Sequence, residues 1–82
     1  MIHWTRHAAN YEMKPPTEGF PIAVWISPSR LEDDSFVYGL TIYAGGTRIL
    51  AKQFPDFETA ESFVCDWFER LKEQLEDLLR WG

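Results

Sequence analysis

The fold is decided by residues 59–81, which read TAESFVCDWFERLKEQLEDLLRW. Apolar residues recur in this stretch at intervals of three and four, which is typical of one face of an α-helix. They are Ala60, Phe63, Val64, Trp67, Phe68, Leu71, Leu75, Leu78 and Leu79. Neither Gly nor Pro interrupts them. We predict one long helix over residues 58–81 with Thr59 as its N-cap, and we expect the upstream residues to cover its apolar stripe.

Three stretches upstream are rich in β-branched and aromatic residues. They predict strands from Phe20 to Ser27, from about Ser35 to Ala44, and from Thr47 to Phe54. Residues 28–34 are expected to form a polar connection, and Gly45-Gly46 to supply the positive φ angles of a tight hairpin. The predicted fold class is α+β, with a three-stranded antiparallel sheet (β-β-β-α) packed on the helix.

The alternation along these strands predicts two different sheet faces. The residues expected to face the helix are Ile22, Val24, Ile26, Leu40, Ile42, Ile49 and Leu50. Trp25, Val37, Thr41 and Tyr43 are expected on the other face. Residues 1–19 are predicted to form an arm or a short edge strand that ends in a Pro-rich linker. Either this arm covers the second face with Trp4 and Tyr11, or the face is an open interaction patch.

Composition indicates a single domain over residues 1–82, with 45% hydrophobic and 16% aromatic residues. The single cysteine, Cys65, excludes an internal disulfide. No signal peptide and no membrane-spanning run is recognised, so we expect a cytoplasmic protein, in a bacterial host cell if phage-encoded.

The net charge of -5 is concentrated near the predicted helix. Residues 56–77 hold eight acids against only Arg70 and Lys72. Because a nucleic-acid-binding protein normally shows a basic stripe, we expect no direct nucleic-acid binding. Because no apolar run is long enough to cross a bilayer, we also expect no membrane as a partner.

The acids of the helix, foremost Asp66, Glu69, Glu73 and Glu76, are expected opposite the apolar stripe. They form either a solvated face, relieved by Asp66–Arg70 and Glu76–Arg80 pairs, or a docking surface for a basic partner.

Residues suited to catalysis are few, and we expect neither an enzyme nor a cofactor. His3 and His7 would share a face only on a helix, and no third metal ligand is set by spacing, so we expect no metal site. Cys65 is expected to be a half-buried structural thiol, because no base is placed beside it. Asp33 and Asp34 lie in an acidic loop without an apolar pocket.

Several segments together resemble small phage-encoded anti-CRISPR proteins. These are Pro21-Ile22-Ala23-Val24-Trp25, then Gly46 to Phe54 with its A-K-x-F ending, then Phe57 to Phe63. The resemblance implies a non-enzymatic inhibitor that binds a subunit of a type I RNA-guided surveillance complex, with Trp25 as the matched binding residue. The acidic loop and the Pro-rich arm depart from that pattern.

A HicB-like antitoxin is the alternative resemblance. That family has a β-β-β-α core and a helix start similar to Thr59-Ala60-Glu61, although its P-D-x-P-G turn is absent here. Both resemblances imply a protein partner, and a homodimer is left open. The partner-binding residues predicted from the sequence are Trp25, Tyr43, Asp66, Glu69, Glu73 and Glu76.

Overall fold

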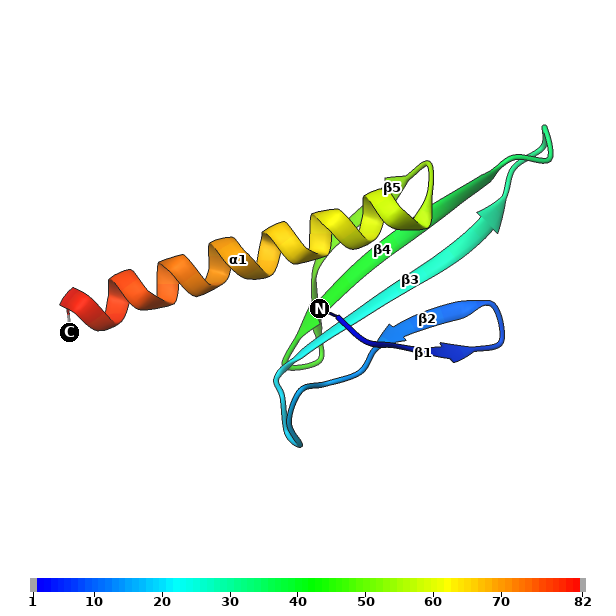
Figure 1. The fold of residues 1–82 in the computed structure, drawn as a ribbon. Coiled ribbons are helices and arrows are strands. Elements are labelled where there is room, and N and C mark those ends of the chain that lie inside the picture. Colours follow the sequence, from blue (N-terminus) through cyan, green and yellow to red (C-terminus); the bar gives the residue numbers. More distant parts are fainter. Residues whose placement is uncertain (1, 82) are drawn as a thin grey trace.

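Five strands form one antiparallel sheet, and one long helix packs on one face of it (Figure 1). The computed structural model describes residues 2–81. The strands are β1 (Trp4–His7), β2 (Asn10–Met13), β3 (Ile22–Arg30), β4 (Phe36–Ala44) and β5 (Thr47–Phe54), and the helix is α1 (Phe57–Trp81). Each strand pairs with the one before it, in the order β1-β2-β3-β4-β5. The predicted α+β class with an antiparallel sheet and a C-terminal helix is confirmed, but the prediction of three strands was wrong.

The two additional strands come from the segment predicted to be an arm or edge strand. β1 and β2 form a hairpin, and β2 pairs with β3 through Tyr11 opposite Ile26 and Glu12 opposite Trp25. Strands of four residues are too short for their alternation to be visible in the sequence. Their turn also contains no glycine that would mark it in the sequence. Ala8 adopts the positive φ of the turn instead, at 55°.

The core lies between the sheet and the first half of α1. Its fully buried side chains come from both layers. They are Val24, Ile26, Leu40, Ile42, Ala60 and Val64, with Met13 nearly as buried. The predicted facing of β3 and β4 is therefore confirmed. Ala60 lies next to the first turn of α1, where a small side chain lets the helix approach the sheet closely.

Ile49 departs from the prediction that it faces the helix. A β-bulge lies in the β4–β5 pairing, since Ile42 pairs with Leu50 while Tyr43 pairs with Arg48. Ile49 is the unpaired extra residue of β5 and is 51% exposed. Because of this bulge, the residues of β5 on either side of Ile49 do not follow one continuous alternation between the two sheet faces.

Strand β3 continues through Pro28, which was predicted to lie in a connection. Pro28 lies opposite Tyr38 in the β3–β4 ladder. β2 pairs with β3 only at Trp25 and Ile26, so beyond them β3 is an edge on that side. A proline is tolerated there because it has no N–H to leave without a partner.

The helix begins two residues before the predicted N-cap. Asp56 Oδ1 accepts a hydrogen bond of 2.7 Å from the Thr59 backbone N–H, and the Asp56 carbonyl accepts the first helical bond from Ala60. Asp56 is therefore the N-cap, and the assignment of Thr59 was wrong. Thr59 lies at the third helical position, whose N–H an N-cap side chain ordinarily receives.

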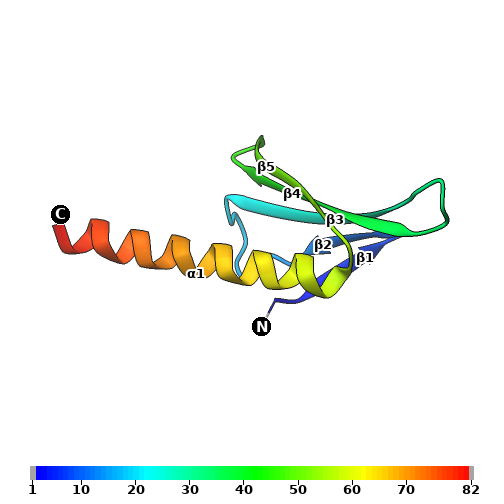
Figure 2. The ribbon, with the colours of Figure 1, turned by 90° about the horizontal axis from the view of Figure 1, so that it is seen from above.

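The helix is longer than the sheet that it covers. The helical residues that contact the core end at Phe68, and Leu71 borders a groove with Leu50 of β5. Beyond Leu71, the exposed fractions of Leu75, Leu78 and Leu79 rise to 50%, 67% and 79%. Figure 2 shows this end of α1 projecting past the sheet. The expectation that the whole apolar stripe is covered was therefore wrong for Leu75, Leu78 and Leu79.

The N-terminal hairpin is attached to the helix by its aromatic side chains. The Trp4 indole N–H donates a hydrogen bond of 2.6 Å to Glu61 Oε2. The Trp4 and Tyr11 rings contact Phe57, with centroid distances of 5.6 and 4.7 Å. Trp4 and Tyr11 thus pack on the helix side of the sheet and do not cover its other face.

Replacing Asp56 tests the helix N-cap. Asp56→Ala is expected to lower the midpoint of thermal unfolding by roughly 4–8 °C, because the Thr59 N–H loses its acceptor. Asp56→Ser keeps an acceptor and should retain most of the stability. Equal midpoints for wild type and Asp56→Ala, measured by circular dichroism, would contradict the assignment.

The same cap predicts a dependence on pH. The hydrogen bonds from the Thr59 backbone and side chain hold the pKa of Asp56 below its ordinary value of 3.8. A lowered folded-state pKa means that the charged cap stabilises the fold above about pH 4, and that this contribution is lost as the pH falls through the lowered pKa. The difference in melting temperature between wild type and Asp56→Asn should therefore narrow below about pH 4. A constant difference down to low pH would show that the carboxylate charge contributes nothing.

Replacing Glu61 tests the attachment of the hairpin. Glu61→Ala should lower the free energy of unfolding by about 1 kcal/mol, because it leaves the half-buried Trp4 N–H without its acceptor. Glu61→Gln keeps an acceptor oxygen and is the matched control. Hydrogen exchange should speed up in β1 for the alanine variant only; unchanged exchange in β1 would mean that the aromatic contacts alone hold the hairpin.

Candidate functional site

The face of the sheet opposite α1 is not covered by any element of the described chain (Figure 2). The pairing registers place Trp25 beside Thr41 and Ala23 beside Tyr43, in rows that alternate with the core-facing ones. Trp25 and Tyr43 therefore lie on one face, as predicted. We refer to Trp25, Thr41, Tyr43 and Val37, with the flanking His7 and Glu12, as the open sheet face.

His7 and Glu12 flank Trp25 on this face. The His7 ring lies 5.7 Å from the Trp25 ring, centroid to centroid, and His7 Nε2 lies 3.1 Å from Glu12 Oε1. Glu12 in turn pairs directly with Trp25 across β2 and β3. These contacts restrict the indole, so that a half-buried aromatic side chain is presented in a defined orientation. Sequence reasoning missed His7 here, because only the β1–β2 hairpin brings it to Trp25.

The four predicted acidic residues lie on a different surface. Asp66, Glu69, Glu73 and Glu76 are exposed on α1, away from the apolar stripe that packs on the sheet. The helix thus separates them from Trp25 and Tyr43, and the six predicted partner-binding residues do not form one site.

The ion pairs predicted for the helix differ from those observed. Arg80 lies 3.8 Å from Asp77 and not beside Glu76, and the Arg70 side chain donates to the Asp66 backbone carbonyl instead of the carboxylate. Among the described residues, Asp66, Glu69, Glu73 and Glu76 therefore form no ion pair with another side chain of α1.

A groove of about 470 Å³ lies between the N-terminal segment and α1. His3 and Cys65 both line it, with Met13, Phe20 and Phe68 among the apolar neighbours. Cys65 is exposed, so the prediction of a half-buried thiol was wrong. No hydrogen bond joins Cys65 to His3 in the part of the chain that the structure describes, and no three metal-ligating side chains within residues 2–80 lie close enough together to hold an ion.

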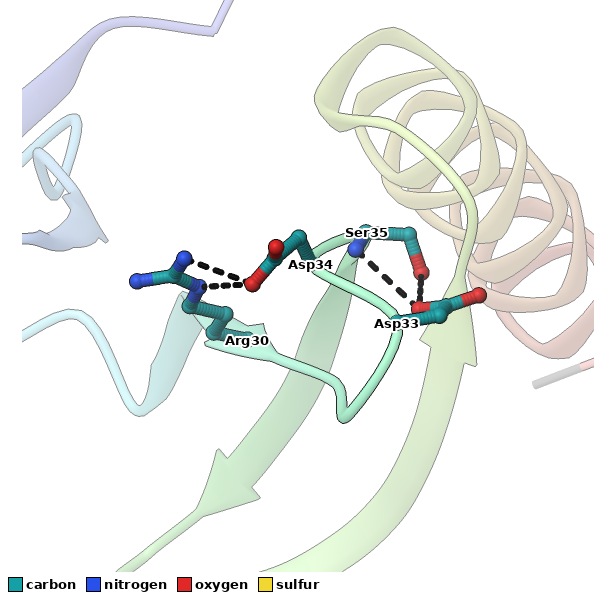
Figure 3. A network of polar contacts seen from close by, with 4 residues as sticks. All are labelled: Arg30, Asp33, Asp34 and Ser35. Carbon is teal, nitrogen blue, oxygen red and sulfur yellow. Dashed lines mark hydrogen bonds and ion pairs between the residues drawn. The ribbon is translucent and has the colours of Figure 1, made fainter.

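The acidic β3–β4 loop is held in shape by its own residues (Figure 3). Asp34, at a positive φ of 67°, accepts two hydrogen bonds from the Arg30 guanidinium, at 2.6 and 3.1 Å. Asp33 accepts hydrogen bonds from the Ser35 hydroxyl and backbone N–H, and these lower the pKa of the Asp33 carboxyl. The two carboxylates therefore stabilise a turn and do not converge on a shared site.

The fold and surfaces together define an α+β protein with a five-stranded antiparallel sheet, an open aromatic sheet face and a projecting helix. Comparison with models of protein families, with characterised proteins and with solved structures gives no match. No helix within residues 2–81 is long and apolar enough to cross a membrane.

Proposed function

We propose that the chain is a non-enzymatic protein-binding module whose open sheet face receives a partner protein. The observation that carries this proposal is the uncovered position of Trp25 and Tyr43, opposite the face that α1 occupies. Interface residues that contribute most to binding are enriched in Trp and Tyr, because such side chains bury a large area at little cost in conformational entropy.

The surroundings of Trp25 suit this role. His7 and Glu12 restrict the indole before binding, which lowers the entropy lost when a partner arrives. The row beside Trp25 contains Thr41 and Ala51, which are small enough to let a partner surface approach the ring. Among the residues that define the open sheet face, Glu12 is the one acidic residue, so this face can receive an apolar or mixed surface of a partner protein.

We propose as the partner class a subunit of a bacterial defence complex, on the basis of the resemblance to anti-CRISPR proteins. A subunit that binds RNA carries basic surface, and the net charge of -5 would favour encounter with it. The acids of α1 then act at long range on the rate of association, while the open sheet face makes the contact.

Binding to a purified type I surveillance complex tests this proposal. Trp25→Ala is expected to weaken binding by roughly 30-fold or more, as is usual for a central interface aromatic. Phe36→Ala is the matched control, because Phe36 is a large exposed residue at the start of β4 that belongs to another surface. Reversal of Glu69, Glu73 and Glu76 to Lys should slow association and leave dissociation unchanged.

Three results would contradict the proposal or redirect it. Absence of binding, together with no rescue of phage infection in cells that carry a type I system, would exclude the anti-CRISPR function. Binding that Trp25→Ala leaves intact would exclude the open sheet face. Protection of cells against a co-expressed small toxin would favour the antitoxin alternative instead.

A further inference from the structure

Strand β5 is the last strand of the sheet, and its outer edge has no partner strand within the described chain (Figure 2). On its inner side it pairs with β4. The bulge at Ile49 disturbs the start of the strand, whereas the pairs from Leu50 to Phe54 follow one another without interruption. Alternate residues of this regular stretch therefore present backbone N–H and C=O groups outward, where a further extended chain can pair with them.

A groove lies directly beside this edge, on the side of the sheet that α1 covers. Its volume is about 350 Å³. Leu50 forms the apolar wall on the β5 side, and the apolar wall on the α1 side is made of Phe63, Trp67 and Leu71. Each of these side chains is only partly buried, so an apolar group that entered the groove would remove more of their surface from water. An α-helix is about 10 Å across and does not fit the groove, whereas a single bulky side chain does.

The polar side chains around the groove differ in charge from the rest of the molecule. They are Lys52, Arg70 and Gln74. No Asp or Glu of the described residues lines the groove, although the chain holds 13 acids against 8 bases. No ion pair within residues 2–81 involves Lys52 or Arg70. The groove therefore combines apolar walls with two positive charges that no carboxylate of the described chain neutralises.

The positions of the two cations set the length of a ligand. Leu50 and Lys52 pair with core residues of β4, so both point to the α1 side of the sheet. Lys52 Nζ lies 4.9 Å from the centroid of the Phe63 ring. Arg70 follows Phe63 by about 10 Å along the helix axis. In an extended chain, side chains four positions apart on one face are separated by about 13 Å, which long charged side chains can match.

We propose that the edge of β5 and the adjoining groove bind an extended acidic peptide segment of a partner, which adds to the sheet as a sixth strand. The main chain of the peptide pairs with β5 between Leu50 and Phe54, and one apolar side chain enters the groove. Carboxylates two positions to either side of it meet Lys52 and Arg70. Alternate side chains of an extended chain share a face, so the peptide carries the pattern acid-x-apolar-x-acid. This surface is separate from the open sheet face, and the proposal does not depend on the proposed function.

A second copy of β5 fits this edge less well than an acidic peptide does. β5 carries Arg48 and Lys52 and no acid, so two β5 strands side by side would bring only positive charges together. A basic peptide would meet the same repulsion. A purely polar anion would leave the apolar walls of the groove in contact with water.

NMR titration of the full isotope-labelled chain with the peptide acetyl-TETFTET-amide tests the proposal. The backbone amide signals from Leu50 to Phe54 and the Trp67 indole signal are expected to shift, with a dissociation constant of roughly 0.1–1 mM, as suits so short a ligand. The reference peptides TKTFTKT and TETATET should bind at least about tenfold more weakly, because one reverses the charges and the other removes the apolar anchor. Equal binding of TKTFTKT, or no binding of TETFTET, would overturn the proposal.

Charge reversal in the protein tests the two cations. Lys52→Glu and Arg70→Glu are each expected to weaken binding of TETFTET at least about tenfold. Lys72→Glu is the matched control, because it changes the net charge equally on α1 but Lys72 does not line the groove. Circular dichroism of each variant confirms that the fold is kept. Weakening by Lys72→Glu to the same extent would reveal a general effect of net charge and contradict the assigned site.

Methylation of the peptide backbone tests the strand pairing. One version of TETFTET carries N-methyl groups on the Thr residues, and another carries them on the Glu and Phe residues. Alternate N–H groups of an extended chain point to the same side, so methylation should cost at least about tenfold in affinity in one version and far less in the other. Equal affinities of the two versions would show that the main chain does not pair with β5, which would overturn the proposal.

Two further measurements separate this site from other surfaces and occupants. Trp25→Ala should leave binding of TETFTET unchanged, because Trp25 lies on the opposite face of the sheet. Loss of binding in that variant would assign the peptide to the open sheet face and overturn the proposal. Without peptide, the amide signals of β5 should not depend on protein concentration. A concentration-dependent shift there would show that a second copy occupies the edge, and that result would also overturn the proposal.

Discussion

The structure depends on the contact between the first half of α1 and the central strands. Ala60 and Val64 are fully buried against Val24, Ile26, Leu40 and Ile42, and the described residues form no third layer of helices or strands over this core. A chain of 82 residues has room for only one such core. The aromatic residues around it, Phe57 foremost, then attach the N-terminal hairpin, because Trp4, Tyr11 and Tyr38 all pack against that one ring.

This single layer of packing has a direct consequence for the surface. A sheet covered by one helix keeps its second face exposed, and a helix longer than the sheet keeps its last turns exposed. Both uncovered surfaces are apolar or aromatic, and they lie apart from each other. Our proposed function assigns the open sheet face to a partner protein.

Sequence patterns predicted the parts of the fold that follow a regular period. The helix, the three central strands and the two faces of β3 and β4 all followed from spacing, because apolar side chains in these elements must point to one core. The features that these patterns predicted wrongly share a different cause. Asp56 rather than Thr59 caps α1, Ile49 lies in a bulge, and Pro28 belongs to a strand, because each depends on hydrogen bonds to a neighbour that the sequence does not identify.

The sequence by itself determined the elements that carry the candidate surfaces, including Trp25 and Tyr43 on one sheet face and the acids on the outer side of α1. Only the tertiary structure decided which surfaces remain uncovered. The β1–β2 hairpin joined the sheet edge instead of crossing the open sheet face, and it brought His7 to Trp25. Likewise, the stripe of α1 is continuous in the sequence, but the sheet beneath it ends near Leu71. The period of the apolar residues predicts which way a side chain points. The length and position of the opposing sheet decide whether that side chain is buried.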